Sequence, residues 1–209
     1  MRVSAGEADR VPSTNGRLGL VALAGLVVLS PLLLAVAAAI VILDPGPVFF
    51  RQTRVGRLFK PFRVIKFRTM RAAAGGPEIT AGGDGRVTPV GRWLRKTKLD
   101  ELPQLFNVLC GDMSLVGPRP EVPKYVELFR KDYETVLSVR PGITDYAAIE
   151  YRDEEASLKA YADPEKGYVD RILPDKIKLY RRYIANISLV IDIKLVLATL
   201  LKIAGPRPD

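Results

Sequence analysis

The sequence contains no histidine and only one cysteine, Cys110, among its 209 residues. The lack of histidine excludes a Ser/His/Asp or Cys/His triad, an imidazole general base and a zinc site with histidine ligands. A single cysteine excludes an internal disulfide and is typical of a reducing compartment. Any catalysis must therefore rest on carboxylates, on Lys and Arg, on hydroxyl groups or on a hard metal ion.

Acidic residues are scarce relative to basic ones, with 23 Asp and Glu against 32 Lys and Arg and a formal net charge of +9. Such an excess indicates an anionic partner, a class that includes nucleic acid, phospholipid and phosphorylated small molecules. The length, with 48% hydrophobic and 26% charged residues, suits one globular domain and leaves little room for a second.

Charge is absent altogether from residues 18–43, an apolar run of 26 residues. As a helix this run extends about 39 Å, more than the ~30 Å hydrocarbon core of a bilayer. It is too long for the apolar part of a cleavable signal peptide, and Glu7 and Asp9 precede it. The run is therefore expected to enter a membrane.

Ser30 and Pro31 interrupt this run near its middle. Pro31 predicts a kink because its ring collides with the carbonyl of Val27, and the Ser30 hydroxyl is able to satisfy a freed backbone group. Two outcomes stay open, a kinked helix that spans the membrane and a re-entrant hairpin whose ends emerge on the same face. The residues alone mildly favour the spanning helix.

Eight basic residues and no acidic one lie between residues 51 and 71, directly after the apolar run. This excess places that side of the membrane in the cytoplasm, against anionic lipid headgroups. Within the basic stretch, the alternation from Phe62 to Phe67 predicts a strand. Residues 72–86, rich in Ala and Gly, predict a loop.

An adjacent acidic pair, Asp100 and Glu101, follows a second basic cluster. Asp100 occupies the expected N-cap of a helix with Pro103 in its first turn, and apolar residues recur behind it at helical spacing. A carboxylate at the N-terminus of a helix, near cations, stays ionised in a site that binds phosphate. The same pattern fits a purely structural cap, so both interpretations remain open at this point.

Two turns rich in Pro and Gly each present an arginine: Arg119 lies between Pro118 and Pro120, and Arg140 begins RPGIT. The apolar spacing over residues 122–136 predicts one amphipathic helix between these turns. Residues 173–202 predict a basic helix and then an apolar segment that lies on the membrane or packs as a core helix.

Taken together, several motifs resemble the bacterial sugar transferase family, the small monotopic phosphoglycosyl transferases. They are the Ser30-Pro31 break, KFRTM at residues 66–70, LDELPQLFNVLCGDMSLVGPRP at residues 99–120 and RPGIT at residues 140–144. The resemblance covers the chain from about residue 16 to its end. It implies a mixed α/β, mainly helical fold with a small β-hairpin and amphipathic interfacial helices around an active site on the cytosolic face. It also implies an N-terminal tail (1–17), a re-entrant membrane helix broken at Ser30-Pro31 (18–43) and a catalytic domain (44–209), so it overturns the preference for spanning.

The resemblance implies transfer of a sugar 1-phosphate from a UDP-sugar to a polyprenol phosphate such as undecaprenyl phosphate, with Mg²⁺. The reaction would pass through a covalent aspartyl phosphosugar, release UMP and open bacterial glycan assembly at the inner membrane. Membrane lipids are further expected partners, nucleic acid is not, and a homo-oligomer is left open.

Carried onto this sequence, the resemblance makes Asp100 the nucleophile and Glu101 its neighbour in a catalytic dyad that also holds Mg²⁺. Glu101 either binds the metal or orients the acceptor phosphate. After RPGIT, Asp145-Tyr146 replaces a Gly-Trp pair found in many relatives, which leaves the sugar open. The remaining residues implied are phosphate-binding Lys66, Arg95 and Arg119, the nucleotide or sugar contacts Arg140 and Arg152, and Asp112 as a partner for an arginine.

Two rival functions remain. A membrane-anchored basic module that binds nucleic acid or anionic lipid would use the cationic stretches and need no acidic dyad. A Mg²⁺-dependent pyrophosphatase would hydrolyse nucleotide sugars without a lipid acceptor.

Overall fold

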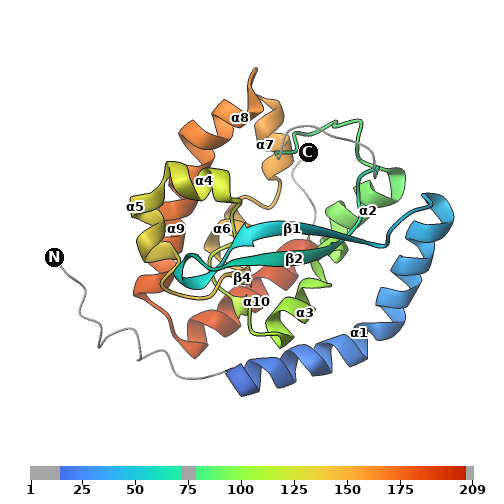
Figure 1. Cartoon of the computed structure of the whole chain (residues 1–209), viewed down its shortest axis with the longest axis horizontal. Helices are drawn as coiled ribbons and strands as arrows, with labels where there is room; N and C mark the ends of the chain where they lie inside the picture. Colours follow the sequence, from blue (N-terminus) through green and yellow to red (C-terminus); the bar gives the residue numbers. More distant parts are fainter. Residues whose placement is uncertain (1–14, 72–78, 206–209) are drawn as a thin grey trace.

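The computed structural model describes residues 15–71 and 79–205. Figure 1 shows helices arranged around a central hairpin. In chain order the elements are α1 (Asn15–Leu43), β1 (Phe49–Val55), η2 (Arg57–Phe59), β2 (Pro61–Phe67), α2 (Pro89–Thr97), η3 (Leu99–Glu101), α3 (Gln104–Leu109), β3 (Ser114–Val116), α4 (Pro123–Leu128), α5 (Arg130–Val136), β4 (Gly142–Thr144), α6 (Tyr146–Glu150), α7 (Glu154–Lys159), α8 (Pro164–Gly167), η4 (Tyr168–Ile172), α9 (Leu173–Ala185) and α10 (Leu189–Ala204).

The sheets are small, and the mainly helical class with a β-hairpin is confirmed. β1 and β2 pair antiparallel from Phe49 opposite Phe67 to Val55 opposite Pro61. The strand predicted over residues 62–67 is thus the second strand of this hairpin. A short parallel pair, β3 with β4, was not predicted.

Of the loop predicted over residues 72–86, residues 72–78 lie outside the described part, and residues 79–86 contain no helix or strand.

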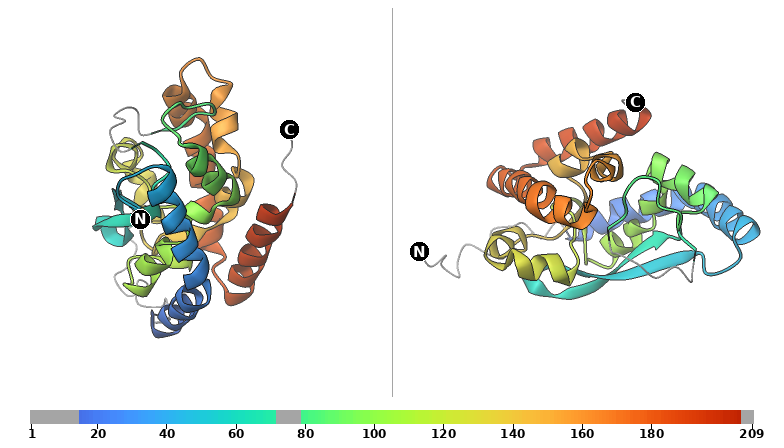
Figure 2. Two further views of the ribbon diagram at one scale, coloured as in Figure 1. Left: turned by 90° about the vertical axis from the view of Figure 1, so that its right-hand side faces the viewer. Right: turned by 90° about the horizontal axis from the view of Figure 1, so that it is seen from above.

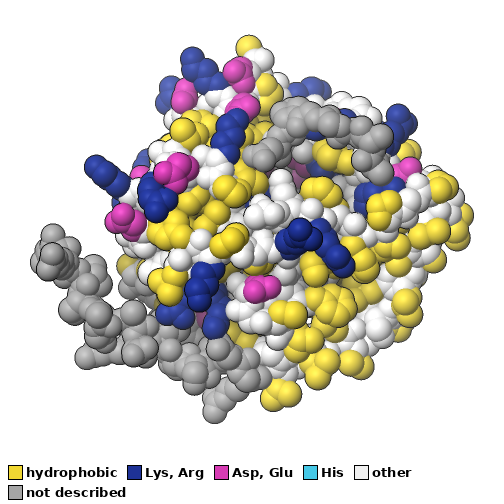
Figure 3. All heavy atoms as spheres, viewed as in Figure 1, with side chains coloured by type: hydrophobic (Ala, Val, Ile, Leu, Met, Phe, Trp, Pro, Cys, Tyr) yellow, Lys and Arg dark blue, Asp and Glu magenta, His cyan; other side chains and the backbone are white. Residues whose placement is uncertain are grey.

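The apolar run folds as one long helix, α1, that changes direction near its middle (Figure 1). Pro31 lies inside the helix, and the Ser30 hydroxyl donates a 2.7 Å hydrogen bond to the carbonyl of Val27. That carbonyl is the group whose helical partner proline removes. By length and composition the segment Leu18–Leu43 is able to cross a membrane. Hydrophobic side chains cover its outer surface along the lower right edge of Figure 3.

Both halves of α1 pack against the rest of the protein. On the N-terminal side of Pro31, Ala22 and Leu26 are buried against α3 and β2. On the C-terminal side, Val36 and Ile40 are buried against Phe67 of β2 and Leu94 of α2. The bend therefore lets one helix follow the surface of the domain over most of its length.

The main core is formed by α4, α5, α6, α9 and η4, with buried tyrosines among its aliphatic residues. The single helix predicted over residues 122–136 is wrong, because the chain breaks at Phe129, with φ −115° and ψ 34°, between α4 and α5. The side chain of Phe129 packs against this core at the break. Pro123 begins α4.

The C-terminal helix α10 lies at an outer edge of the molecule in both views of Figure 2. Its contacts with the domain are partly polar: Thr199 shares a hydrogen bond with Thr144, and Asp192 accepts a 2.8 Å bond from the Tyr183 hydroxyl. Large apolar side chains on the rest of its surface are exposed, among them Leu189, Val190, Ile193, Leu197, Leu200 and Leu201. The apolar segment is thus a surface helix with an unpaired apolar face.

Candidate active site

The acidic pair lies in η3, a single 3-10 turn that directly follows α2. α2 ends at Thr97, and its C-cap residue Lys98 has a left-handed φ of 59° that redirects the backbone into this turn. The prediction that Asp100 caps a helix is therefore wrong: α3 begins only at Gln104, with Pro103 at its N-cap position. The turn instead buries both carboxylates, leaving Asp100 7% and Glu101 8% exposed.

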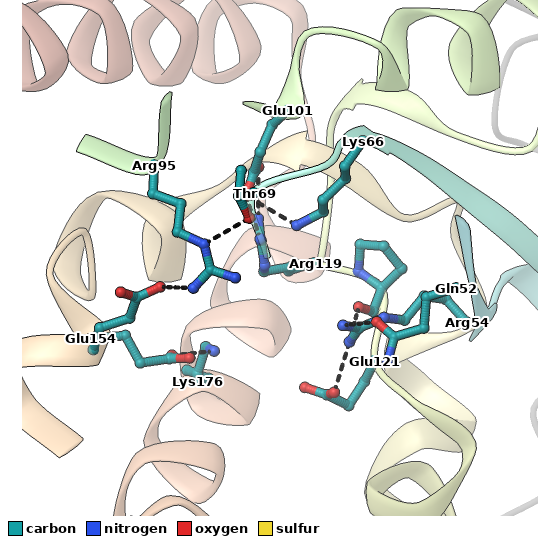
Figure 4. Close-up of polar contacts among 12 residues, drawn as sticks. Gln52, Arg54, Lys66, Thr69, Arg95, Glu101, Arg119, Glu121, Glu154 and Lys176 are labelled. Carbon is teal, nitrogen blue, oxygen red and sulfur yellow. Dashed lines mark hydrogen bonds and ion pairs between the residues drawn. The ribbon is translucent and has the colours of Figure 1, made fainter. Parts of the chain in front are cut away.

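Glu101 is the centre of an ion cluster drawn from three separate segments (Figure 4). Its carboxylate accepts two hydrogen bonds from the Arg119 guanidinium, at 2.9 and 2.5 Å, and one from Lys66 Nζ at 3.1 Å. Burial opposes ionisation of Glu101, but the charges of Arg119 and Lys66 outweigh it and hold the pKa of Glu101 well below its usual range. Glu101 is thus a fixed anion that orients two cations.

Asp100 differs from its neighbour because its Oδ1 atom is buried and has no hydrogen-bond partner among the residues that the structure describes. Burial, together with the adjacent charge of Glu101, raises the pKa of Asp100 to about 6. Burial also lowers the pKa of Lys66, to about 8. At neutral pH the site therefore holds an ionised, unpaired carboxylate beside a charged ammonium group.

A narrow hollow opens between the hairpin, α3 and the turn that carries Arg119. Its lining residues are Arg54, Val64, Lys66, Gln104, Arg119 and Pro120. Arg54 is held at this wall by bonds from its guanidinium to the Pro120 carbonyl at 3.2 Å and to Glu121 at 3.0 Å (Figure 4). Three cations therefore share one small wall, a set that suits a phosphate.

The two arginine-bearing turns that the sequence presents separately meet at their backbones. A Cβ on Gly142 would lie 2.1 Å from the nitrogen of Gly117, so only glycine permits this approach. Asp145 then accepts hydrogen bonds from the backbone N–H of Arg119 at 3.1 Å and of Ala148 at 2.6 Å. The residue that departs from the family pattern, Asp145, therefore positions the backbone of Arg119.

Two further arginines expected at the site, Arg95 and Arg152, lie in different places. Arg95 lies near Asp100, and its guanidinium donates to Thr69 Oγ1 at 2.9 Å (Figure 4). It also donates to Glu155 Oε1 at 2.6 Å. Arg152, in contrast, donates to the carbonyls of Lys202 and Ile203 and so caps the C-terminal end of α10.

Arg140 is half-buried, and its carbonyl oxygen lies against Gly117. Asp112 is exposed, and in the described part of the chain its side chain pairs with no arginine. The role expected of Asp112 belongs to Glu101, which binds Arg119, and to Glu155, which binds Arg95.

Several residues of this network were not singled out from the sequence. Two of them could have been found from the sequence. Thr69 belongs to the KFRTM motif, and Arg54 belongs to the basic stretch after the apolar run. Glu155 and the ion pair of Lys176 with Glu154, at 2.5 Å, had no such signal, because these acids lie far along the chain from the residues they contact.

Carboxylate oxygens available to a metal ion are few. Within the described ranges no group of three or more Cys, His, Asp and Glu residues is arranged to hold one. Both oxygens of Glu101 already bind cations, whereas Asp100 Oδ1 has no hydrogen-bond partner among the residues described. Mg²⁺ commonly binds one or two carboxylates plus water and substrate phosphates. Asp100 fits such a site as its main protein ligand.

Comparison with known proteins identifies one family and several relatives. Residues 19–206 match the sequence model of the family described as bacterial sugar transferase. The chain is 40% identical over 183 residues, 85% of its length, to the UDP-glucose:undecaprenyl-phosphate glucose-1-phosphate transferase of Escherichia coli (strain K12). It is 41% identical over 175 residues, 81% of its length, to the protein of that name from Caulobacter vibrioides.

A third relative is the UDP-N-acetylgalactosamine-undecaprenyl-phosphate N-acetylgalactosaminephosphotransferase of Aeromonas hydrophila, 40% identical over 178 residues and 82% of this chain. The matched regions span only 38% of the Aeromonas protein, 37% of the Escherichia protein and 61% of the Caulobacter protein. The chain therefore corresponds to part of these longer proteins. None of these names favours a nucleic-acid-binding or lipid-binding module.

Proposed function

The chain belongs to the bacterial sugar transferase family, and from this premise we propose that it transfers a sugar 1-phosphate from a UDP-sugar to undecaprenyl phosphate. The observation that carries the proposal is Asp100, a buried carboxylate whose Oδ1 has no partner among the described residues and which lies within the electrostatic reach of Lys66. The names of the relatives supply the two substrate classes.

The reaction that suits this site has two displacement steps. An Asp100 oxygen attacks the phosphorus that bears the sugar, and the bond from that phosphorus to the UMP oxygen breaks, so that UMP leaves with the electron pair. An oxygen of the lipid phosphate then attacks the same phosphorus, forms the lipid diphosphosugar and releases the Asp100 carboxylate. No general base is needed, because Asp100 is ionised above a pKa of about 6.

Charge repulsion is the main barrier that the site must overcome. A carboxylate and a phosphate charge 4 Å apart repel by about 4 kcal/mol at an effective dielectric constant of 20. Lys66 and Arg119 supply positive charge, and Glu101 fixes their positions through three hydrogen bonds. Mg²⁺, held by Asp100 with phosphate and water oxygens, would neutralise further charge when bound. Glu101 acts mainly by orienting the two cations.

The same proposal includes a monotopic placement at the cytoplasmic face of the bacterial inner membrane. Its support is that residues of α1 on both sides of Pro31 pack on the domain, as expected of a helix that returns to the face it entered from. The basic stretch after α1 indicates the cytoplasmic side. Tags at Met1 and Asp209 should be protected on the same side of sealed vesicles, whereas tags on opposite sides would show a spanning helix.

A labelling experiment tests the covalent route. Purified protein is incubated with Mg²⁺ and UDP-sugars labelled in the sugar, beginning with UDP-glucose and UDP-N-acetylgalactosamine, without lipid acceptor. Peptide mass spectrometry should find the phosphosugar on Asp100, and D100N should remove the label while the control D112N, at an exposed carboxylate, retains it. Label at another residue, or none under conditions that support turnover, contradicts the route.

A second measurement separates transfer from hydrolysis. Under steady turnover UMP should form in proportion to the polyprenol phosphate supplied, with one lipid diphosphosugar for each UMP. Continued UMP release without the lipid, accompanied by free sugar phosphate, would show that the protein is a pyrophosphatase.

A further inference from the structure

One buried polar group at the site has no function in the reaction described so far. Gln104, the first residue of α3, is 1% exposed and lines the hollow beside the dyad. Its amide nitrogen, Nε2, is buried and has no hydrogen-bond partner within residues 18–71 and 79–205. A buried donor without a partner costs free energy, and most native proteins avoid it. This amide therefore needs a separate explanation.

The groups around Gln104 indicate what would satisfy its N–H. The hollow that it lines also contains the side chains of Lys66, Arg54 and Arg119. The nitrogen atoms of all four side chains are hydrogen-bond donors. A wall of donors that includes three cations suits a strongly accepting anion, above all a phosphoryl oxygen.

A second amide on the same helix shows that the fold is able to satisfy such a group internally. Asn107 is also buried, but its Oδ1 accepts from the backbone N–H of Ile65 at 3.0 Å, and its Nδ2 donates to the carbonyl of Arg63 at 2.8 Å. Asn107 thus fastens α3 to β2, whereas Gln104 leaves its donor unused. The contrast separates an amide that is used within the fold from one that has no such use in the described ranges.

We propose that Gln104 is a substrate-binding residue whose Nε2 donates a hydrogen bond to a phosphoryl oxygen held between Lys66 and Arg119. The inference rests on the proposed function, because that function supplies the phosphates. The accepted oxygen belongs either to the diphosphate of the sugar nucleotide or to the phosphate of the lipid, since both present the same chemistry. With Gln104 four residues after Asp100, this contact would orient the phosphate relative to the attacking carboxylate.

Two substitutions at Gln104 and one at Asn107 test the inference. Gln104→Met keeps the length of the side chain and removes the donor, whereas Gln104→Glu keeps the shape and introduces a charge that repels phosphate. Asn107→Leu is the structural control, because it breaks two bonds within the fold. For each protein the measurements are Kd for UDP and for inorganic pyrophosphate with Mg²⁺ by calorimetry, KM for UDP-sugar and for polyprenol phosphate, and Tm.

Gln104→Met should weaken binding of the phosphate concerned about 10- to 100-fold, the range expected for a hydrogen bond to a charged group. Gln104→Glu should weaken it further. The Tm of Gln104→Met should equal or exceed that of the wild type, because an unpaired donor is removed, while Asn107→Leu lowers Tm. Weaker UDP and pyrophosphate binding with a higher KM for UDP-sugar assigns the contact to the nucleotide, and a higher KM for the lipid alone assigns it to the acceptor.

Other results overturn the inference. Unchanged Kd and KM values for Gln104→Met in every arm would show that the amide binds no phosphate, and a fall in Tm like that of Asn107→Leu would make it a structural group. Failure of the proposed function is a different result. A wild-type protein that binds pyrophosphate through Gln104 but releases no UMP from any UDP-sugar retains the anion contact and loses the transferase activity.

Discussion

Replacing Asp100 by Asn should stabilise the folded protein while it abolishes sugar-phosphate transfer. The reason is that Asp100 is ionised at neutral pH in a place where burial disfavours its charge, with Oδ1 unpaired in the described part of the chain. Asn keeps the shape of the side chain and removes the charge. A nucleophile held in this way contributes to catalysis at the expense of stability.

The magnitude follows from the pKa of Asp100. Burial and the neighbouring Glu101 raise it from 3.8 to about 6, a difference that corresponds to about 3 kcal/mol of destabilisation when the group is ionised in the folded state. Asn still buries a polar group, so we expect about half of this gain. For a protein of this size, ~1.5 kcal/mol raises Tm by about 3–6 °C.

The assay is thermal unfolding in detergent, followed by intrinsic fluorescence between pH 4 and pH 8 in the presence of EDTA. A raised pKa means that the folded state binds the proton more tightly than the unfolded state, so the penalty is fully present above about pH 6 and disappears as the pH falls toward 3.8. The Tm advantage of D100N should therefore be largest at pH 7–8 and shrink toward pH 4.

Two other carboxylates, one in the site and one exposed, provide matched controls. Glu101→Gln should lower Tm at neutral pH, because it leaves Arg119 and Lys66 without their shared anion, and breaking a buried pair costs about 3–5 kcal/mol. Asp112→Asn, at an exposed position, should leave Tm unchanged. If D100N lowers Tm, or raises it equally at every pH, Asp100 is not a desolvated carboxylate and the reasoning is refuted.

Three further predictions concern the cations. Because burial lowers the pKa of Lys66 to about 8, its charge is lost as the pH rises through that value, so kcat/KM for UDP-sugar should fall there, and Lys66→Arg should move the fall to higher pH. A pH profile that Lys66→Arg leaves unchanged would contradict this assignment. Arg119→Ala should reduce kcat/KM at least 100-fold, much more than it reduces stability, whereas equal losses of both would assign Arg119 a structural role. Arg152→Ala should remove the bonds to the end of α10 and cost about 1–3 kcal/mol in unfolding free energy with KM unchanged; a raised KM at constant Tm would make Arg152 a ligand contact.

Much of the fold was predictable because its signals are local. The apolar run, the strand over residues 62–67 and the bend at Pro31 follow from hydropathy, alternation and the missing N–H of proline. The helix start assigned to Asp100 failed because the pattern of Asp, Glu and Pro fits an α-helical first turn. The sequence carries no separate sign of the left-handed Lys98 or of the 3-10 turn that follows it.

The candidate site was predictable as a set of residues but not as an arrangement. Motifs indicated Asp100, Glu101, Lys66 and Arg119, and the structure joins the last three in one ion cluster. No local pattern indicated that Asp145 supports the backbone of Arg119 or that Arg152 caps α10. Contacts of this kind depend on how distant segments approach one another.

By itself the sequence determined the chemistry available to this protein. Without histidine, and with the acidic pair Asp100-Glu101 directly after a basic cluster, it limited catalysis to carboxylate, cation and metal chemistry beside an apolar segment long enough to enter a membrane. Tertiary structure alone decided that Glu101 pairs with Lys66, 35 residues away, and with Arg119, 18 residues away, while Asp100 and Gln104 each keep an atom without a partner in the part of the chain that the structure describes. The physical reason is that pairing and desolvation depend on distances in space, which spacing along the chain does not fix.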